Sequence, residues 1–162
     1  MAMNKPRVYI ETTIPSFYYE TRTQPDLVAW RDLTREWWSD AAEQYELLTS
    51  FVVRQELAGG TGSRVRMRLE LLDGIPLLAS TPEIDEIVEV YLQHRLMPRK
   101  PSTADAAHLA LASYYGCDFI ATWNCRHLAN PNKVAHIRRI NSALGLHVPE
   151  LVTPQDLLRR RR

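Results

Sequence analysis

Four polar side chains are spaced along the chain at positions that suit a site for a divalent cation. They are Glu11, Glu56, Asp105 and Asn124. Hard cations such as Mg²⁺ prefer oxygen ligands and are bound through one or two carboxylates. A cation held in this way can stabilise charge on a phosphate and generate hydroxide from bound water. Clustered side chains of these types therefore favour the cleavage of phosphodiester bonds.

The pattern of apolar residues and helix caps predicts the elements that must position these side chains. Short β-rich runs occupy residues 7–10, 45–49, 75–78 and 119–122. Segments with helical spacing lie between and after them, over residues 25–42, 51–57, 63–72, 82–91, 104–115, 133–144 and from 154 onward. Strands that alternate with helices in this way indicate an α/β domain. We expect a central, mainly parallel sheet of four to five strands, flanked by helices.

The topology of such a sheet predicts that the candidate side chains meet. Sites in open parallel sheets gather at the carboxyl ends of the strands, where the helices also begin. Glu11 and Asn124 each follow a predicted strand, and Asp105 lies in the first turn of a helix. Glu56 lies nearly two turns into its helix and fits this edge less closely.

Each candidate also has a purely structural interpretation. Asp105 can complete a capping box with Ser102 at the start of its helix. Glu56 can be a solvated surface glutamate, and Glu11 an ordinary turn residue. Asn124 can be a turn former, because asparagine tolerates the backbone geometries that turns require.

Size and composition indicate a single globular domain. The chain has 162 residues, of which 45% are hydrophobic and 24% are charged, and its net charge is +1. No apolar run approaches the roughly 20 residues that span a bilayer, and no signal-peptide pattern opens the chain, so we expect a cytoplasmic protein with no membrane partner. The two cysteines, Cys117 and Cys125, have no metal-binding spacing, and we expect both to be buried.

The positive charge is unevenly distributed. Arg159, Arg160, Arg161 and Arg162 end the chain. We expect residues 1–158 to form the domain and residues 159–162 to form a basic tail, for which an ordinary solvated surface is the alternative interpretation; if the chain acts on RNA, this tail is the candidate contact with the RNA backbone. Further arginines and a lysine flank a loop near residues 95–100. The helix over residues 25–42 carries Trp30, Trp37 and Trp38, which are candidates for a protein interface.

Four pieces of the sequence together resemble the PIN-domain family, in particular the VapC-type ribonuclease toxins of type II toxin–antitoxin systems. They are the opening stretch from Val8 to Ser16, the helical stretch from Ser50 to Leu57, the stretch from Ala104 to Ala110 and the stretch from Cys117 to Asn124. The resemblance spans nearly the whole chain. It implies a PIN-like fold and a Mg²⁺- or Mn²⁺-dependent nuclease that acts on RNA.

The resemblance also implies roles for individual residues and partners. Glu11, Glu56 and Asp105 would hold the cation, and Asn124 would assist through a metal-bound water. A homodimer and a small antitoxin are the implied partners. Two residues depart from the family pattern, since Glu11 and Asn124 stand where aspartates are usual. The loss of a charge at Asn124 leaves a second hypothesis open, in which the chain is a catalytically weak or silent PIN module that binds RNA or a protein.

Overall fold

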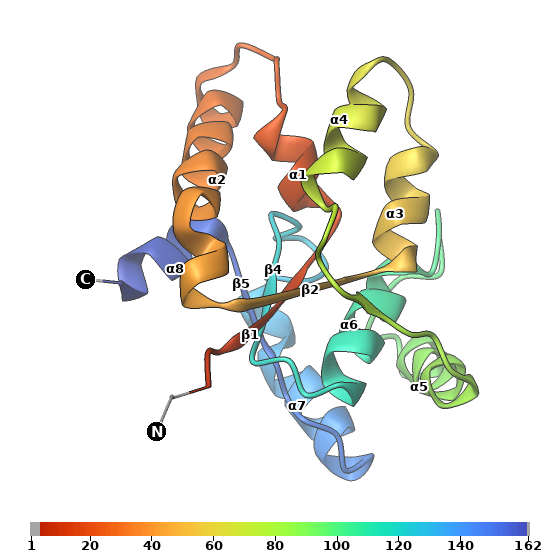
Figure 1. The fold of residues 1–162 in the computed structure, drawn as a ribbon. Coiled ribbons are helices and arrows are strands. Elements are labelled where there is room, and N and C mark those ends of the chain that lie inside the picture. Colours follow the sequence, from red (N-terminus) through yellow and green to blue (C-terminus); the bar gives the residue numbers. More distant parts are fainter. Residues whose placement is uncertain (1–3, 162) are drawn as a thin grey trace.

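The computed structural model describes residues 4–161 and has a five-stranded parallel sheet at its centre (Figure 1). The strands are β1 (Arg7–Ile10), β2 (Glu46–Ser50), β3 (Leu77–Leu78), β4 (Phe119–Ala121) and β5 (Glu150–Val152). Their order in the sheet is β3-β2-β1-β4-β5, and every pairing is parallel. The first strand is therefore the central one, and in its register Val8 lies between Leu47 of β2 and Phe119 of β4.

Helices connect the strands and cover the sheet. They are α1 (Thr13–Tyr18), α2 (Pro25–Gln44), α3 (Phe51–Ala58), α4 (Arg64–Leu71), α5 (Pro82–Gln93), α6 (Ala104–Tyr114), α7 (Val134–Ala143) and α8 (Pro154–Arg160), with a 3₁₀ turn, η1 (Pro131–Lys133), before α7. Figure 1 shows α1 and α2 on one side of the sheet and α5, α6 and α7 on the other. This is the α/β architecture that the alternating pattern predicted. Among the described residues, no helix has the length and apolar character needed to cross a membrane.

The core lies on both faces of the central strands. Tyr9 and Ile10 of β1 point to opposite faces, because successive side chains alternate along a strand, and both are fully buried. Trp37 of α2 is fully buried, and α6 contributes an almost continuous run of buried residues from Ala106 to Ser113. Burial of α6 on nearly all sides explains why its sequence is apolar all round.

The caps expected from the sequence are formed at three helices. The side chains of Ser50, Thr81 and Thr153 accept backbone N–H groups of the first turns of α3, α5 and α8. Gly116 ends α6 with φ of 68°, a left-handed conformation that glycine adopts without steric cost. These local signals mark where α3, α5 and α8 begin and where α6 ends.

Several details of the sequence prediction are wrong. Residues 13–18 form α1, which was not among the predicted helices, and the edge strand β5 was not among the runs identified. The capping box at α6 is absent, because Ser102 accepts the N–H of Ala104 and the helix begins after Thr103. Cys117 is buried as expected, but Cys125 is exposed.

The C-terminal arginines also behave differently from a free tail. The helix α8 continues through Arg160, two residues into the segment expected to be a tail. Arg160 pairs with Glu150 and lies over the ring of Phe119, and Arg161 pairs with Asp40 of α2. Arg162 lies outside the described residues.

Candidate functional site

The carboxyl edge of the sheet carries a buried carboxylate, Glu11, directly after β1. Its side chain accepts hydrogen bonds from the Thr13 N–H at 3.0 Å, from the Thr13 hydroxyl, and from the Thr122 hydroxyl at 2.7 Å. Glu11 is 3% exposed. Burial raises the pKa of Glu11, and the charge of His108 with the hydrogen bonds from Thr13 and Thr122 offsets only part of that effect.

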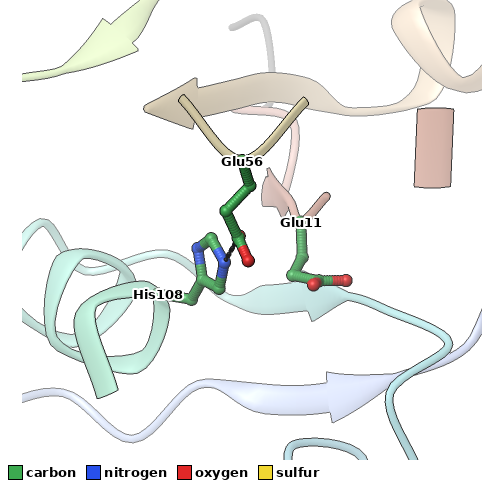
Figure 2. A group of neighbouring side chains, drawn as sticks. All are labelled: Glu11, Glu56 and His108. Atoms are coloured by element: carbon green, nitrogen blue, oxygen red, sulfur yellow. Dashed lines mark hydrogen bonds and ion pairs between the residues drawn. The ribbon is translucent and has the colours of Figure 1, made fainter. Parts of the chain in front are cut away.

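A second carboxylate, Glu56 of α3, lies against His108 of α6 (Figure 2). The His108 Nε2 and Glu56 Oε1 atoms are 2.7 Å apart, and the Thr12 hydroxyl donates to the same Glu56 oxygen at 2.6 Å. The other ring nitrogen of His108, Nδ1, is 2.7 Å from the Tyr9 hydroxyl, which in turn is 2.7 Å from the Ser50 hydroxyl. A continuous hydrogen-bonded chain thus runs from the buried core to the exposed side of Glu56.

The chain of contacts fixes the protonation of His108 at Nε2. A bare Nε2 lone pair would face the Glu56 carboxylate, so this nitrogen must carry the hydrogen and donate it. Burial acts to lower the pKa of His108, but the hydrogen bond to Glu56 and the charges of Glu11, Glu56 and Asp105 outweigh burial, and the net shift is upward. Burial likewise acts to raise the pKa of Glu56, but His108 and the Thr12 hydrogen bond outweigh it and lower the value.

Asp105 and Asn124 form the other side of the site. The Asn124 Nδ2 donates to Asp105 Oδ1 at 3.2 Å, and the Asn124 Oδ1 accepts the His127 N–H at 3.0 Å. The backbone donor of His127 therefore determines which way the amide faces. Asn124 presents its NH₂ group to the Asp105 carboxylate, and its oxygen accepts the hydrogen bond from the His127 backbone.

The three carboxylates share a feature that suits a cation. All the hydrogen bonds that Glu11 and Glu56 accept end on Oε1, and the one that Asp105 accepts ends on Oδ1. Within the described part of the chain, the second oxygen of each carboxylate accepts none. One oxygen is thus held in place by donors while the other stays available. Atoms of Glu11, Glu56 and His108 lie within 4.8 Å of one another, so the two carboxylates are close enough to share one ion, with the His108 ring beside them. Among the described residues, Asp105 is not part of this group.

The structure brings Glu11 and Glu56 together and pairs Asp105 with Asn124. His108 was missed as a site residue because it lies in an apolar stretch. It follows Asp105 by three positions, and that helical spacing places both on one face, which was the available signal. Thr12 and Thr122 donate their hydroxyl groups to Glu56 and Glu11 and so hold these carboxylates in place.

The arginines of the C-terminal segment lie away from this site. Arg160 contacts Phe119 and Glu150, the first residues of β4 and β5. Glu11 follows the last residue of β1, and Thr122, which donates to it, follows the last residue of β4, so the two groups occupy opposite edges of the parallel sheet.

Comparison with known proteins agrees with this architecture. Residues 26–133, more than half of the chain, match the PIN domain family, and this range includes Glu56, Asp105 and Asn124 but not Glu11. No curated protein matches the chain at a significant level.

Solved structures share the fold at low sequence identity. A chain of VapBC2 from Rickettsia felis, solved on a DNA fragment from its promoter, is similar with a TM-score of 0.54 and 12% identity over 91% of this chain and 98% of that chain. A chain of FitAcB from Neisseria gonorrhoeae has a TM-score of 0.49 and 15% identity, with the same coverage of 91% and 98%. With the family match over most of its length, the chain belongs to the PIN domain family.

Proposed function

We propose that this chain is a Mg²⁺- or Mn²⁺-dependent endoribonuclease, the toxin of a toxin–antitoxin pair. PIN domains are in general nucleases. The observation that carries the proposal is the pair of carboxylates Glu11 and Glu56, whose oxygens lie within 4.8 Å of each other, with the charge of Asp105 acting on the same His108. An all-oxygen set of this kind suits Mg²⁺ and Mn²⁺ better than softer ions.

The three carboxylates have different parts in the proposed reaction. Glu11 is the most buried and the most firmly held, so it fixes the position of the cation against the sheet. Glu56 has 34% of its side chain exposed and is the carboxylate that solvent and substrate reach. A bound cation would stabilise negative charge on the scissile phosphate and acidify water for the attack.

His108 and Asn124 act on the carboxylates rather than on the phosphate. His108 donates to Glu56 from a fully buried position, so its charge offsets part of the repulsion between Glu11 and Glu56. Asn124 donates to Asp105 and holds one of its oxygens. We therefore propose that Asn124 is a positioning residue and not a ligand that acts through water.

Cleavage of a mixed RNA pool tests the nuclease proposal. We expect cleavage with Mg²⁺ or Mn²⁺, none in EDTA, and a loss of about 10²-fold or more in Glu56→Gln and Asp105→Asn. Glu46→Gln, an isosteric change at the opposite edge of the sheet, is the matched control and keeps full activity. The same cations raise the melting temperature of the wild type, because they bind only the folded protein, and Asp105→Asn reduces that rise.

A specific observation supports the alternative of a silent module. The amide of Asn124 directs its N–H donors toward Asp105. A carboxylate at position 124 would instead add a fourth negative charge to attract a cation. Absence of cleavage in every divalent metal, together with an unchanged melting temperature, would favour a PIN module that binds RNA or protein without turnover.

The proposed partners are an antitoxin and a second copy of the chain. The similar structures named above are complexes, and that of VapBC2 was solved on promoter DNA. Co-expression with a short reading frame adjacent to this one, followed by light scattering of the purified protein, measures both associations. A monomer that co-purifies with no partner would contradict this part of the proposal.

A further inference from the structure

A pocket of about 580 Å³ lies beside the acidic site, between the end of α5, the loop that follows it and η1. Four basic side chains line it, namely Arg95, Arg99, His127 and Lys133, together with apolar residues of the α5 end such as Leu96 and Met97. Among residues 4–161, no acidic side chain lines the pocket. Its chemistry is therefore that of a site for an anion.

Most of these positive groups have no carboxylate partner. Within the part of the chain that the structure describes, Arg95, His127 and Lys133 make no ion pair, and only Arg99 pairs, with Glu89 at 3.1 Å. The Lys133 ammonium is held at the pocket by the Leu96 carbonyl at 2.9 Å. Burial lowers the pKa of the nearby His136, and the positive charges of Arg139, His94 and Lys133 lower it further, which is a sign of concentrated positive charge.

The backbone at Arg95 adds an independent observation. Arg95 has φ of 55°, the only positive φ of a non-glycine residue in the described range, at the turn that ends α5. The Leu96 N–H bonds to the Tyr91 carbonyl there, a helix ending in which glycine is the usual residue at the left-handed position. An arginine at this left-handed position lowers the stability of the fold. We therefore infer that its side chain has a functional role.

The pocket is connected to the acidic site by two hydrogen bonds. His127 lines the pocket and donates its N–H to Asn124, and Asn124 donates to Asp105. A polyanion whose reacting phosphate lies at Glu11, Glu56 and Asp105 would place an adjacent part of its backbone at this pocket.

We propose that this pocket binds a backbone phosphate of the RNA strand, next to the phosphate that is cleaved, through Arg95 and Lys133. The inference rests on the proposed nuclease function and names how its substrate is held. Phosphate contacts supply affinity without base information, so the pocket sets how tightly RNA binds and not which sequence is cut.

Two charge-removing variants test the proposal. Arg95→Gly removes the guanidinium and relieves the left-handed backbone, so the variant unfolds at the same or a higher temperature than the wild type. Lys133→Gln removes the ammonium and keeps a donor for Leu96. The matched control is Arg64→Gln/Arg66→Gln, which removes two charges from exposed positions on α4, a helix that packs on α1 and α3.

Affinity is measured by fluorescence anisotropy with a labelled single-stranded RNA of mixed sequence, in EDTA, at several salt concentrations. We expect each pocket variant to weaken binding about tenfold, because each removes a charged donor of hydrogen bonds to a phosphate oxygen. The slope of log affinity against log salt falls by about 0.7 for each phosphate that the variant no longer neutralises. With Mg²⁺ or Mn²⁺ present, KM rises while kcat and the cleavage positions stay the same.

The outcomes separate this inference from the nuclease proposal. Equal losses in the pocket variants and the α4 control would overturn it, because bulk charge would then explain the binding. Unchanged RNA affinity with weaker binding of a polyglutamate peptide would overturn it and assign the pocket to an acidic protein segment. RNA binding that depends on the pocket, without cleavage by the wild type, would sustain the inference and refute the nuclease. A wild type that binds no RNA would refute both.

Discussion

At the scale of single residues, Asn124 is held at both ends of its side chain. The His127 N–H occupies its oxygen and Asp105 occupies its nitrogen, at 3.0 and 3.2 Å. An aspartate of the same shape would keep the first contact and turn the second into an approach of two carboxylates. The amide therefore stabilises the metal-free site, and a carboxylate here would stabilise only the metal-bound one.

Asn124→Asp tests how the site responds when this amide is replaced by a carboxylate. In EDTA we expect the free energy of unfolding to fall by about 1–2 kcal/mol, because like charges at this distance raise one carboxyl pKa. Addition of Mn²⁺ should raise the melting temperature more in the variant than in the wild type. Thermal unfolding with and without metal measures both effects. Asn132→Asp, the same change at an exposed position of η1, is the control. Equal behaviour of the two variants would show that Asn124 does not face the cation site.

The sequence predicted the acidic residues of the candidate site better than the residues that hold them by hydrogen bonds. Glu11, Glu56 and Asp105 were identified from residue type, spacing and family resemblance. The contact between His108 and Glu56 joins positions 52 apart and depends on how α3 and α6 pack, which no local pattern encodes. The orientation of the Asn124 amide likewise depends on the backbone of the following turn.

At the scale of elements, the caps that the sequence predicted differ in what they contribute. Thr81 and Thr153 each accept a backbone N–H of the first turn, and at α8 the Asp156 side chain completes a capping box. Ser63, at the corresponding position of α4, makes no such bond. The chain therefore contains its own comparison between formed and unformed caps.

Replacing each cap by alanine makes that comparison. Thr81→Ala and Thr153→Ala should each lower the free energy of unfolding by about 1 kcal/mol, because an N–H of the first turn loses its acceptor. Ser63→Ala should change it by no more than a few tenths of a kcal/mol. Urea denaturation gives all three values. A loss at Ser63 as large as that at Thr153 would mean that the cap geometry does not determine the effect.

The elements missed from the sequence are the short ones. The six residues of α1 include Pro15 and two consecutive β-branched residues, Thr13 and Ile14, which weaken the helical signal. The three residues of β5 lie between Pro149 and Thr153 and are too few to show alternation. Both are formed by packing against the rest of the molecule: α1 packs on α2, and β5 pairs with β4.

At the scale of the whole molecule, the parallel sheet separates two charged regions. Glu11 of the acidic cluster follows the end of β1 and accepts the hydroxyl of Thr122 at the end of β4, whereas Arg160 pairs at the beginning of β5. From the sequence alone, both regions were assigned to the same RNA substrate. The distance between them depends on the fold and cannot be read from the sequence. The parallel direction of the strands sets the two apart, because Arg160 lies at the beginnings of β4 and β5 and Glu11 follows the end of β1.

Truncation after Leu158 tests whether the C-terminal arginines contribute to RNA binding. The shortened chain loses the pairs of Arg160 with Glu150 and Arg161 with Asp40, exposed contacts that contribute about 1 kcal/mol or less each. We expect RNA affinity at physiological salt to change less than about threefold, since charges farther apart than about 8 Å are largely screened. Anisotropy with the same labelled RNA measures it. A tenfold loss would restore the C-terminal arginines as the RNA-binding element.

The bond between the Thr122 hydroxyl and Glu11 joins residues 111 positions apart. During synthesis, the ribosome releases Glu11 long before the strand that supplies this donor. At about 5–20 residues per second, the interval is roughly 5–20 s. Throughout it, the nascent chain carries the Glu11 carboxylate without the Thr122 donor beside it, and for most of it without Asp105 and His108 as well. The proposed nuclease site therefore stays incomplete on the ribosome until β4 has emerged.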